Sequence, residues 1–161
     1  MKFGNGEEPG LDATDVAILQ TLQQDCKSPL ARIGEHVGLS APSVSERIEK
    51  LEQSGVIRGY SAVLGSRELG LDVTAFIGVV VETPSGLESF EETVVSIEGV
   101  LECHHVTGDF DFLLKVVFKN RQELHHFIAN QLGTIRGVLR VNTSVVLKEV
   151  KSTTQLPIPL P

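Results

Sequence analysis

The chain has 161 residues, enough for one ordinary domain or two small ones, each with a modest hydrophobic core. Hydrophobic residues make up 41% of it and charged residues 22%, which is typical of a soluble globular protein. The longest apolar-rich stretch, Val73–Val81, is far shorter than the roughly 20 residues that a membrane-spanning helix needs. Cys26 and Cys103 are the only cysteines, so a disulfide framework is excluded and a cytoplasmic location is expected.

Fourteen lysines and arginines oppose 21 aspartates and glutamates, which gives a net charge of −7. This balance argues against a protein that coats nucleic acids indiscriminately. It does not exclude a sequence-specific DNA-binding protein, because charge acts locally and residues 30–60 are neutral. The charged residues of that segment are Arg32, Arg47, Lys50 and Arg58 against Glu35, Glu46, Glu49 and Glu52.

Three helices are predicted in the first half of the chain, after an arm of residues 1–10 that is expected to be disordered. Each predicted helix begins at a residue able to cap it and carries apolar side chains at spacings of three and four. The caps are Asp12, Ser28 followed by Pro29, and Ser40, and the helices end near Gln24, Val37 and Gln53. A strand is expected over residues 56–64, so that residues 11–64 form a winged helix-turn-helix domain.

The second and third predicted helices, joined by a tight turn at Gly38, have the arrangement of a helix-turn-helix. Helix N-terminal N–H groups and serine hydroxyls suit phosphates, while arginine and serine on an exposed face suit base edges in the major groove. The residues expected to contact DNA are Ser40, Ser43, Ser45, Arg47 and Lys50. For Arg47, an ion pair with Glu46 or Glu49 on a solvated helix is the alternative.

Beyond a predicted linker of residues 65–72, the hydrophobic pattern indicates alternating strands and helices. The expected strands are residues 73–82, 100–107, 110–118 and 138–150, and the expected helices are residues 84–96 and 121–132. This β-α-β-β-α-β order predicts a ferredoxin-like sandwich over residues 73–151, with both helices on one face of an antiparallel sheet. The chain is therefore expected to be an α+β protein of two domains.

The other face of this sheet is expected to meet a second subunit, because the last strand is apolar on both sides. The residues that indicate this are Leu139, Val141, Thr143, Val145 and Leu147. Residues 152–161 form a separate Pro-rich tail, in which residues 155–161 alternate proline with leucine and isoleucine. An extended tail is expected, and docking on a neighbouring surface stays open.

Several motifs occur in an order and spacing that resemble the Lrp/AsnC family of regulators, from Leu11 to Lys151. They are Leu11–Leu19, Ile33–Ser40, Val44–Glu52, Gly55–Tyr60 and Val106–Val116. The resemblance implies a transcriptional regulator that binds a pseudo-palindromic operator in double-stranded DNA and a small effector, usually an amino acid. It also implies a homodimer or a larger assembly, with tetramer and octamer both open.

The resemblance further implies an effector site between subunits. It includes Gly108, Asp109, Phe110, Asp111 and Thr143. The chemistry is plausible, because turn N–H groups can hold an α-carboxylate and Asp109 or Asp111 can hold an α-ammonium group.

Alternatives of three kinds stay open. The histidine pairs His104-His105 and His125-His126 would suit a metal- or pH-responsive regulator of the same fold, although adjacent histidines on a strand diverge. A degenerate helix-turn-helix would leave an interaction module that does not bind DNA. A tetrapyrrole-decarboxylating enzyme is disfavoured, since residues 108–116 do not resemble that branch. No enzymatic activity, cofactor or metal is expected, because the chain has no phosphate loop, nucleophile elbow or zinc motif.

Overall fold

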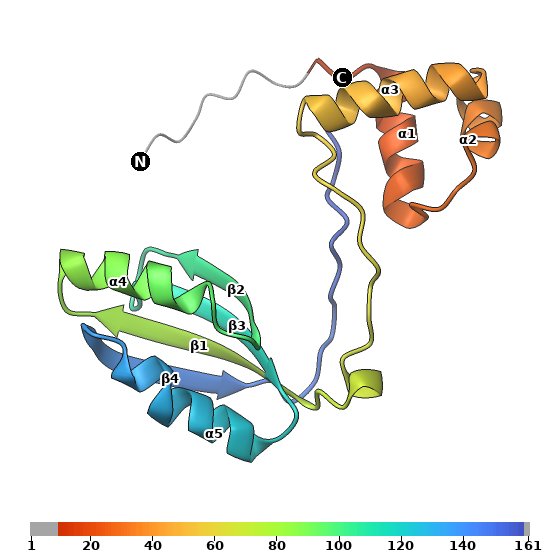
Figure 1. Cartoon of the computed structure of the whole chain (residues 1–161). Coiled ribbons are helices and arrows are strands. Elements are labelled where there is room, and N and C mark those ends of the chain that lie inside the picture. The colour runs from red at the N-terminus through yellow and green to blue at the C-terminus, as the bar shows by residue number, and fades with distance from the viewer. Residues whose placement is uncertain (1–9, 160–161) are drawn as a thin grey trace. The chain divides into compact units, whose positions relative to one another are not determined.

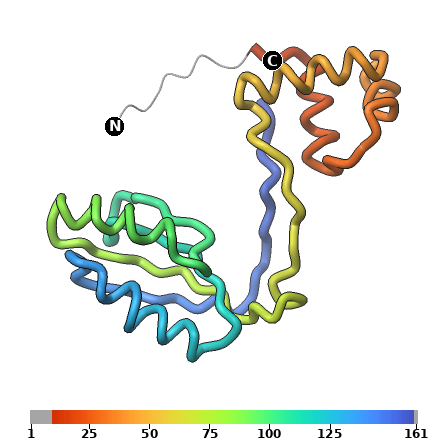
Figure 2. Tube along the Cα trace, viewed as in Figure 1, coloured from red at the N-terminus to blue at the C-terminus, as the bar shows by residue number. Residues whose placement is uncertain are grey.

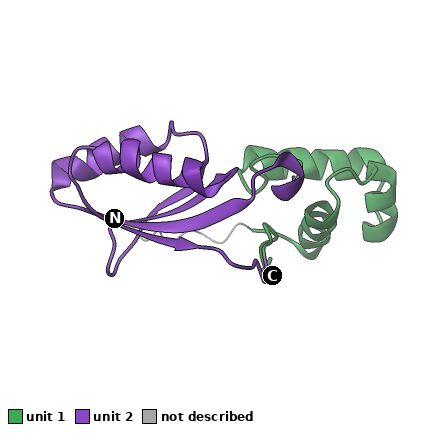
Figure 3. Ribbon diagram, turned by 90° about the horizontal axis from the view of Figure 1, so that it is seen from below, with its two compact units in different colours: residues 1–63, 152–161 green, residues 64–151 purple. Residues whose placement is uncertain are grey.

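The computed structural model describes residues 10–159 and divides into two compact units (Figure 3). The first unit comprises residues 1–63 together with 152–161, and the second comprises residues 64–151. The arm predicted for residues 1–10 lies outside the described residues, except for Gly10. Within residues 10–159, no helix is long and apolar enough to cross a membrane.

The first unit contains the three predicted helices, α1 (Ala13–Gln24), α2 (Leu30–Val37) and α3 (Ala41–Gln53) (Figure 1). Each contributes apolar side chains to one small core. The fully or nearly fully buried members are Ile18, Leu19, Ile33, Val44 and Leu51. The apolar residues predicted at spacings of three and four include Leu19, Ile33, Val44 and Leu51, but the stripe predicted for α1 missed the fully buried Ile18.

The predicted caps of the first and third helices are confirmed. Asp12 accepts a hydrogen bond from the backbone N–H of Asp15 at 2.8 Å, and the Asp15 carboxylate accepts one from the Asp12 N–H at 3.2 Å. Ser40 caps α3 by accepting from the N–H of Ser43. The prediction that Ser28 caps α2 is wrong, because Pro29 occupies the cap and the Ser28 hydroxyl donates to Asp25 instead.

The strand expected over residues 56–64 is wrong, and the helix-turn-helix lacks a wing in the part of the chain that the structure describes. A strand needs a partner for its N–H and C=O groups. The four strands that pair with one another all lie within residues 73–145. The start of the expected strand instead turns back on α3, where the N–H of Ile57 donates to the carbonyl of Leu51 at 3.0 Å.

The C-terminal tail belongs to the first unit. Residues 152–159 follow the second unit in sequence, but they group with the three helices and share their colour in Figure 3. Ile158 packs against their core. The tail is extended, as its alternating prolines predict, and Figure 2 traces it after the last strand of the second unit.

The second unit has the predicted β-α-β-β-α-β order. Its elements are β1 (Val73–Val81), α4 (Pro84–Val94), β2 (Val100–His105), β3 (Phe112–Phe118), α5 (Arg121–Asn130) and β4 (Val138–Val145), with short 3-10 helices η1 (Arg67–Leu69) and η2 (Leu132–Thr134). The strands form one antiparallel sheet in the order β2-β3-β1-β4. Helices α4 and α5 cover one face of it (Figure 1). The central strand β1 places Ala75, Ile77 and Val79 in the core beneath them.

The last strand is shorter than predicted, and Val141 and Thr143 lie on the face opposite the expected one. Thr143 pairs with Ile77 and Val141 pairs with Val79, and directly opposed residues share a face. Since Ile77 and Val79 lie under the helices, Val141 and Thr143 lie on the helix-covered face as well. The expectation that they line the uncovered face is wrong, because the register of β4 against β1 decides which face an alternating set of residues occupies, and the sequence of β4 alone does not give that register.

Gly34 provides a test of packing between α2 and the turn that leads to α3. A Cβ at this buried position would lie against the backbone carbonyl oxygen of Leu39, at a separation that real structures do not show. Gly34→Ala is therefore expected to lower the free energy of unfolding by about 1–3 kcal/mol, despite alanine's better helix propensity. Urea unfolding followed by circular dichroism measures this change. The exposed neighbour variant Glu35→Ala should leave stability nearly unchanged, and equal stability of the two variants would contradict the packing argument.

Candidate DNA-binding surface and effector site

Helix α3 presents a polar face because its apolar residues are held in the core. Val44 is fully buried and Leu51 nearly so, which leaves Ser45, Glu46 and Lys50 exposed on the opposite side. The Ser40 and Ser43 hydroxyls lie 2.8 Å apart at the N-terminal turn, where backbone N–H groups attract anions. The helix can therefore offer hydroxyls and a positive helix end to a phosphate or a base edge.

Lys50 is partly neutralised within the helix. Its Nζ lies 2.8 Å from an Oε1 atom of Glu46, one turn earlier, and both side chains are about two-thirds exposed. An exposed pair of this kind contributes little to stability and exchanges readily with solvent. Lys50 is thus available to a phosphate, since a stronger anion can replace Glu46.

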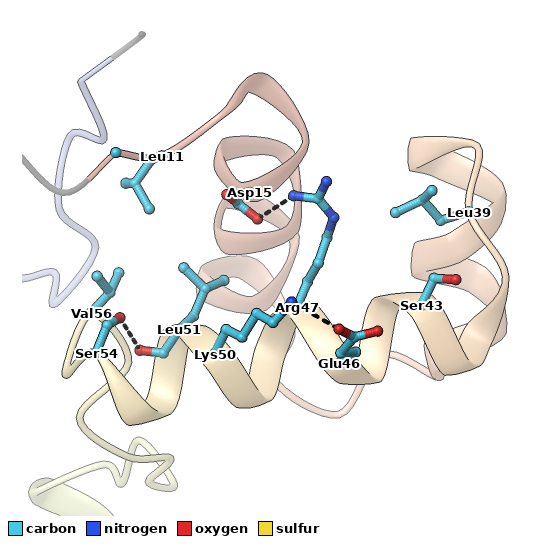
Figure 4. Close-up of a pocket in the computed structure, with 11 residues that line it drawn as sticks. Leu11, Asp15, Leu39, Ser43, Glu46, Arg47, Lys50, Leu51, Ser54 and Val56 are labelled. Carbon is cyan, nitrogen blue, oxygen red and sulfur yellow. Dashed lines mark hydrogen bonds and ion pairs between the residues drawn. The ribbon is translucent and has the colours of Figure 1, made fainter.

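Arg47 departs from the expectation that it lies on the outer face. Its Nη1 donates to Asp12 Oδ2 at 2.7 Å and to Asp15 Oδ1 at 2.8 Å, so its guanidinium bridges α3 to the start of α1. Figure 4 shows the contact with Asp15. Neither Glu46 nor Glu49, the partners considered from the sequence, takes this position. The sequence missed the contact because the partners lie more than thirty residues away, and only the packing of the helices brings them together.

The two aspartates use all four carboxylate oxygens in this arrangement. One oxygen of each accepts a backbone N–H in the capping box, and the other accepts from Arg47. The Asp15 N–H and the Arg47 guanidinium hold the pKa of Asp12 below its usual range. Hydrogen bonds to the two carboxylates likewise raise the pKa of Arg47, so its guanidinium is charged at neutral pH.

A groove of about 630 Å³ lies beside this bridge (Figure 4). Leu11, Leu39, Leu51 and Val56 line its apolar part. Three of the residues predicted to contact DNA also line it, namely Ser43, Arg47 and Lys50. The structure thus brings these three together, while Ser40 and Ser45 lie outside the groove lining.

The predicted effector loop follows β2 in the second unit. Gly108 adopts a φ of 125°, which a residue with a side chain rarely adopts, and Asp109 is exposed beside it. The Asp111 carboxylate is engaged in a hydrogen bond within the fold. Its Oδ2 accepts from the backbone N–H of Val81 at 2.7 Å, next to the irregularity where the pairing of β1 with β4 shifts by one residue.

Phe110 covers Gly78 on the face of the sheet that the helices leave open. A Cβ at Gly78 would collide with the Phe110 ring, so glycine is required for this close packing. The guanidinium of Arg140 lies 5.9 Å from the centre of the same ring, and its Nη2 donates to the carbonyl of Asp109 at 3.2 Å. Arg140 and Gly78 were missed by sequence reasoning, because nothing in the local pattern of β4 or β1 points to the loop.

Thr143 is not brought to this loop within one chain. It shares the helix-covered face with Ile77, whereas the next residue of β1, Gly78, carries Phe110 on the uncovered face. Adjacent strand residues point to opposite faces. The predicted effector residues of the loop and Thr143 therefore lie on different faces of the sheet.

The histidines of β2 also diverge. His105 stacks on Phe112, with ring centres 4.9 Å apart, whereas His104 Nε2 lies 3.1 Å from Glu102 on the other face. Burial, and next the charge of Glu91, raise the pKa of the Cys103 thiol. Within residues 10–159 no three His, Cys, Asp or Glu side chains converge in a way that would hold a metal ion.

Comparison with known proteins decides the family. The AsnC-type helix-turn-helix domain matches residues 11–52, and the Lrp/AsnC ligand binding domain matches residues 74–156. The chain belongs to the Lrp/AsnC family. It is 39% identical over 148 residues to the HTH-type transcriptional regulator FL11 of Pyrococcus abyssi, with 92% of this chain and 97% of the relative covered. The leucine-responsive regulatory protein of Rhizobium meliloti is 37% identical, with coverages of 92% and 96%.

Solved structures of Lrp/AsnC regulators have the same fold. A transcriptional regulator of Neisseria meningitidis in complex with L-Met is 36% identical, with a TM-score of 0.88 over 91% of this chain and 96% of that one. AsnC of E. coli is 27% identical, with a TM-score of 0.86 and coverages of 91% and 99%. The predicted α+β fold class, the family and the function as a helix-turn-helix transcriptional regulator are confirmed.

Acid titration tests the bridge between α3 and α1. Because the pKa of Asp12 is lowered in the folded state, its carboxylate stabilises the unit above the usual value of 3.8, and this contribution is lost as the pH falls through the folded value. Asp12→Asn keeps a capping side chain but loses the charge that faces Arg47. The variant should therefore melt at lower temperature than wild type at pH 7, and this difference should narrow as the pH falls toward 3.

Glu35→Gln is the matched control, because the exposed Glu35 carboxylate makes no ion pair within the described residues. It should reproduce the wild-type dependence of melting temperature on pH. A constant difference in melting temperature between Asp12→Asn and wild type from pH 7 to pH 3 would contradict a role for the charged carboxylate.

Variants at Asp111 and Asp109 distinguish a structural role from a ligand-binding role in the loop. Asp111→Ala leaves the N–H of the buried Val81 without its acceptor, so the second unit should lose about 1–3 kcal/mol of unfolding free energy. Asp109→Ala, an exposed neighbour, should leave stability within about 0.5 kcal/mol of wild type. Urea unfolding and hydrogen exchange of the β1 amides report both effects, and equal protection in the two variants would remove the structural assignment of Asp111.

Proposed function

We propose that this regulator reads DNA with the N-terminal turn and exposed face of α3. The observation that carries the proposal is the arrangement of Ser40, Ser43 and Ser45 in the first turns of α3, with Lys50 exposed in its last turn. Backbone N–H groups and hydroxyls there suit phosphates, and Ser45 is free to meet a base edge. Arg47 has a positioning role in this proposal, because its hydrogen bonds to Asp12 and Asp15 fix the orientation of α3 relative to α1.

Two copies of the chain, or a larger even number, would place two such helices in successive major grooves. A pseudo-palindromic operator follows from the two-fold symmetry of that arrangement. We assign pairing of the second units to the face of the sheet that α4 and α5 leave uncovered. Phe76 and Phe110 lie on this face. A cytoplasmic location agrees with DNA binding and with two unpaired cysteines.

The effector of this proposal is an amino acid. The relative from Neisseria meningitidis carries L-Met, and the loop here offers groups of the right chemistry. Turn N–H groups at Gly108 and the Arg140 guanidinium suit an α-carboxylate, while the exposed Asp109 carboxylate suits an α-ammonium group. Since Thr143 lies on the opposite face in one chain, we assign it to a site completed by the loop of another copy.

The test begins with DNA from upstream of this protein's own gene, compared with a scrambled sequence at fixed salt and with each of twenty amino acids. Specific binding is expected, and one or two amino acids should shift it. Lys50→Ala should reduce affinity and lower the salt dependence by about one counterion, whereas Lys119→Ala, an exposed lysine of the second unit, should not. Asp109→Ala should keep DNA binding and lose the amino-acid response.

A pool of genomic fragments extends the test beyond one promoter. Enrichment of any fragment sharing a two-fold symmetric motif supports the proposal. Absence of enrichment under every condition would contradict DNA reading by this chain and favour the interaction-module alternative. A retained amino-acid response in Asp109→Ala would remove the loop from the effector site.

A further inference from the structure

We propose that the C-terminal tail is a strap that completes the helix-turn-helix unit and couples it to the strand carrying Thr143. The strap consists of residues 152–159, which belong to the first unit although they follow the second unit in sequence. The matched ligand binding domain ends at residue 156 and the matched helix-turn-helix domain at residue 52. Neither match assigns a role to contacts between the tail and the three helices.

Polar contacts hold the strap at the C-terminal end of α1. The Gln23 side chain donates from Nε2 to the carbonyl of Leu156 at 3.1 Å, and its Oε1 accepts from the Leu156 N–H at 2.6 Å. One amide side chain thereby satisfies both backbone groups of a residue, as a neighbouring strand would. The Gln155 side chain returns a hydrogen bond to the carbonyl of Gln23 at 3.1 Å, one of the last carbonyls of α1 that lack a partner within the helix.

Apolar packing follows two residues later. Ile158 packs against the core of the three helices, whereas the side chain of Leu156 is 70% exposed. Pro157 and Pro159 flank Ile158 and restrict the backbone on both sides. A segment already extended before docking loses less conformational entropy when it docks, so a short contact can hold it.

The strap makes a second connection between the two units, because a covalent segment leads to it from β4 and non-covalent contacts hold it on the first unit. The chain leaves the first unit after residue 63 and returns to it at residue 152. Only residues 146–151 separate the end of β4 from the strap. A ligand that restrains β4 near Thr143 therefore acts on a strand whose continuation is held against α1. This coupling step, unlike the docking itself, rests on the proposed effector function.

Hydrogen exchange in the full-length protein tests docking without any ligand or DNA. Ile158→Ser should accelerate exchange of the α1 amides around Leu19 and Leu22 by about tenfold, because the core loses an apolar contact. Leu156→Ser is the matched control, since it changes an exposed side chain and keeps the backbone contacts. Gln23→Ala should act like Ile158→Ser, and Gln24→Ala, whose side chain is exposed, should act like the control. Equal exchange in all four variants and wild type would overturn the docked strap.

Coupling between the strap and β4 is tested by measuring operator affinity with and without the amino acid that changes the affinity of the wild-type protein. Ile158→Ser should still bind operator DNA, but the fold-change produced by the amino acid should fall toward one, while Leu156→Ser should keep the wild-type fold-change. An undiminished fold-change in a variant whose α1 exchange is accelerated would overturn the coupling. A wild-type protein that binds DNA but responds to no amino acid would overturn the coupling together with the proposed effector, and the exchange result would still decide the docking.

Discussion

The small size of the helix-turn-helix unit is the constraint on which much of the structure depends. Three short helices bury few apolar side chains, and a domain of about 60 residues is marginally stable for that reason. Two additions compensate in this chain. Arg47 links α3 to both aspartates of the α1 capping box, and Ile158 extends the core from the far end of the sequence. The stability of the unit that carries α3 therefore depends in part on contacts outside the helix-turn-helix motif itself.

The alternation of side chains along β1 imposes the corresponding constraint on the second unit. Ile77 faces the helices and Gly78 faces the opposite side, where Phe110 packs against its bare Cα. Thr143 pairs with Ile77 and lies on the same face of the sheet, whereas the loop residue Phe110 packs on the face of Gly78. One chain therefore presents the two parts of the predicted effector site on different faces, and a site that uses both requires more than one copy. In the function that we propose, this geometry would link assembly to ligand binding, because each would favour the arrangement that the other needs.

Local patterns in the sequence were sufficient for the helices, for the order of strands and helices along the second unit, and for the caps at Asp12 and Ser40. They were insufficient wherever a contact joins distant residues. The Arg47 bridge, the place of Arg140 beside the loop and the docking of Ile158 all span more than thirty residues, and no periodicity encodes them. The face assigned to β4 was wrong for a related reason, since the register against β1 decides it and a shift of one residue reverses every side chain.

The electrostatics of α3 explain why assembly would matter for a regulator of this charge. The chain has a net charge of −7, Arg47 is neutralised by two aspartates, and Lys50 is paired with Glu46. One α3 thus brings little free positive charge to a phosphate backbone, and a single copy should bind DNA weakly. Two or more tethered copies raise the effective concentration of each helix at its half-site. Control of assembly, or of the angle between tethered helices, is then enough to control DNA binding without any change in the reading surface.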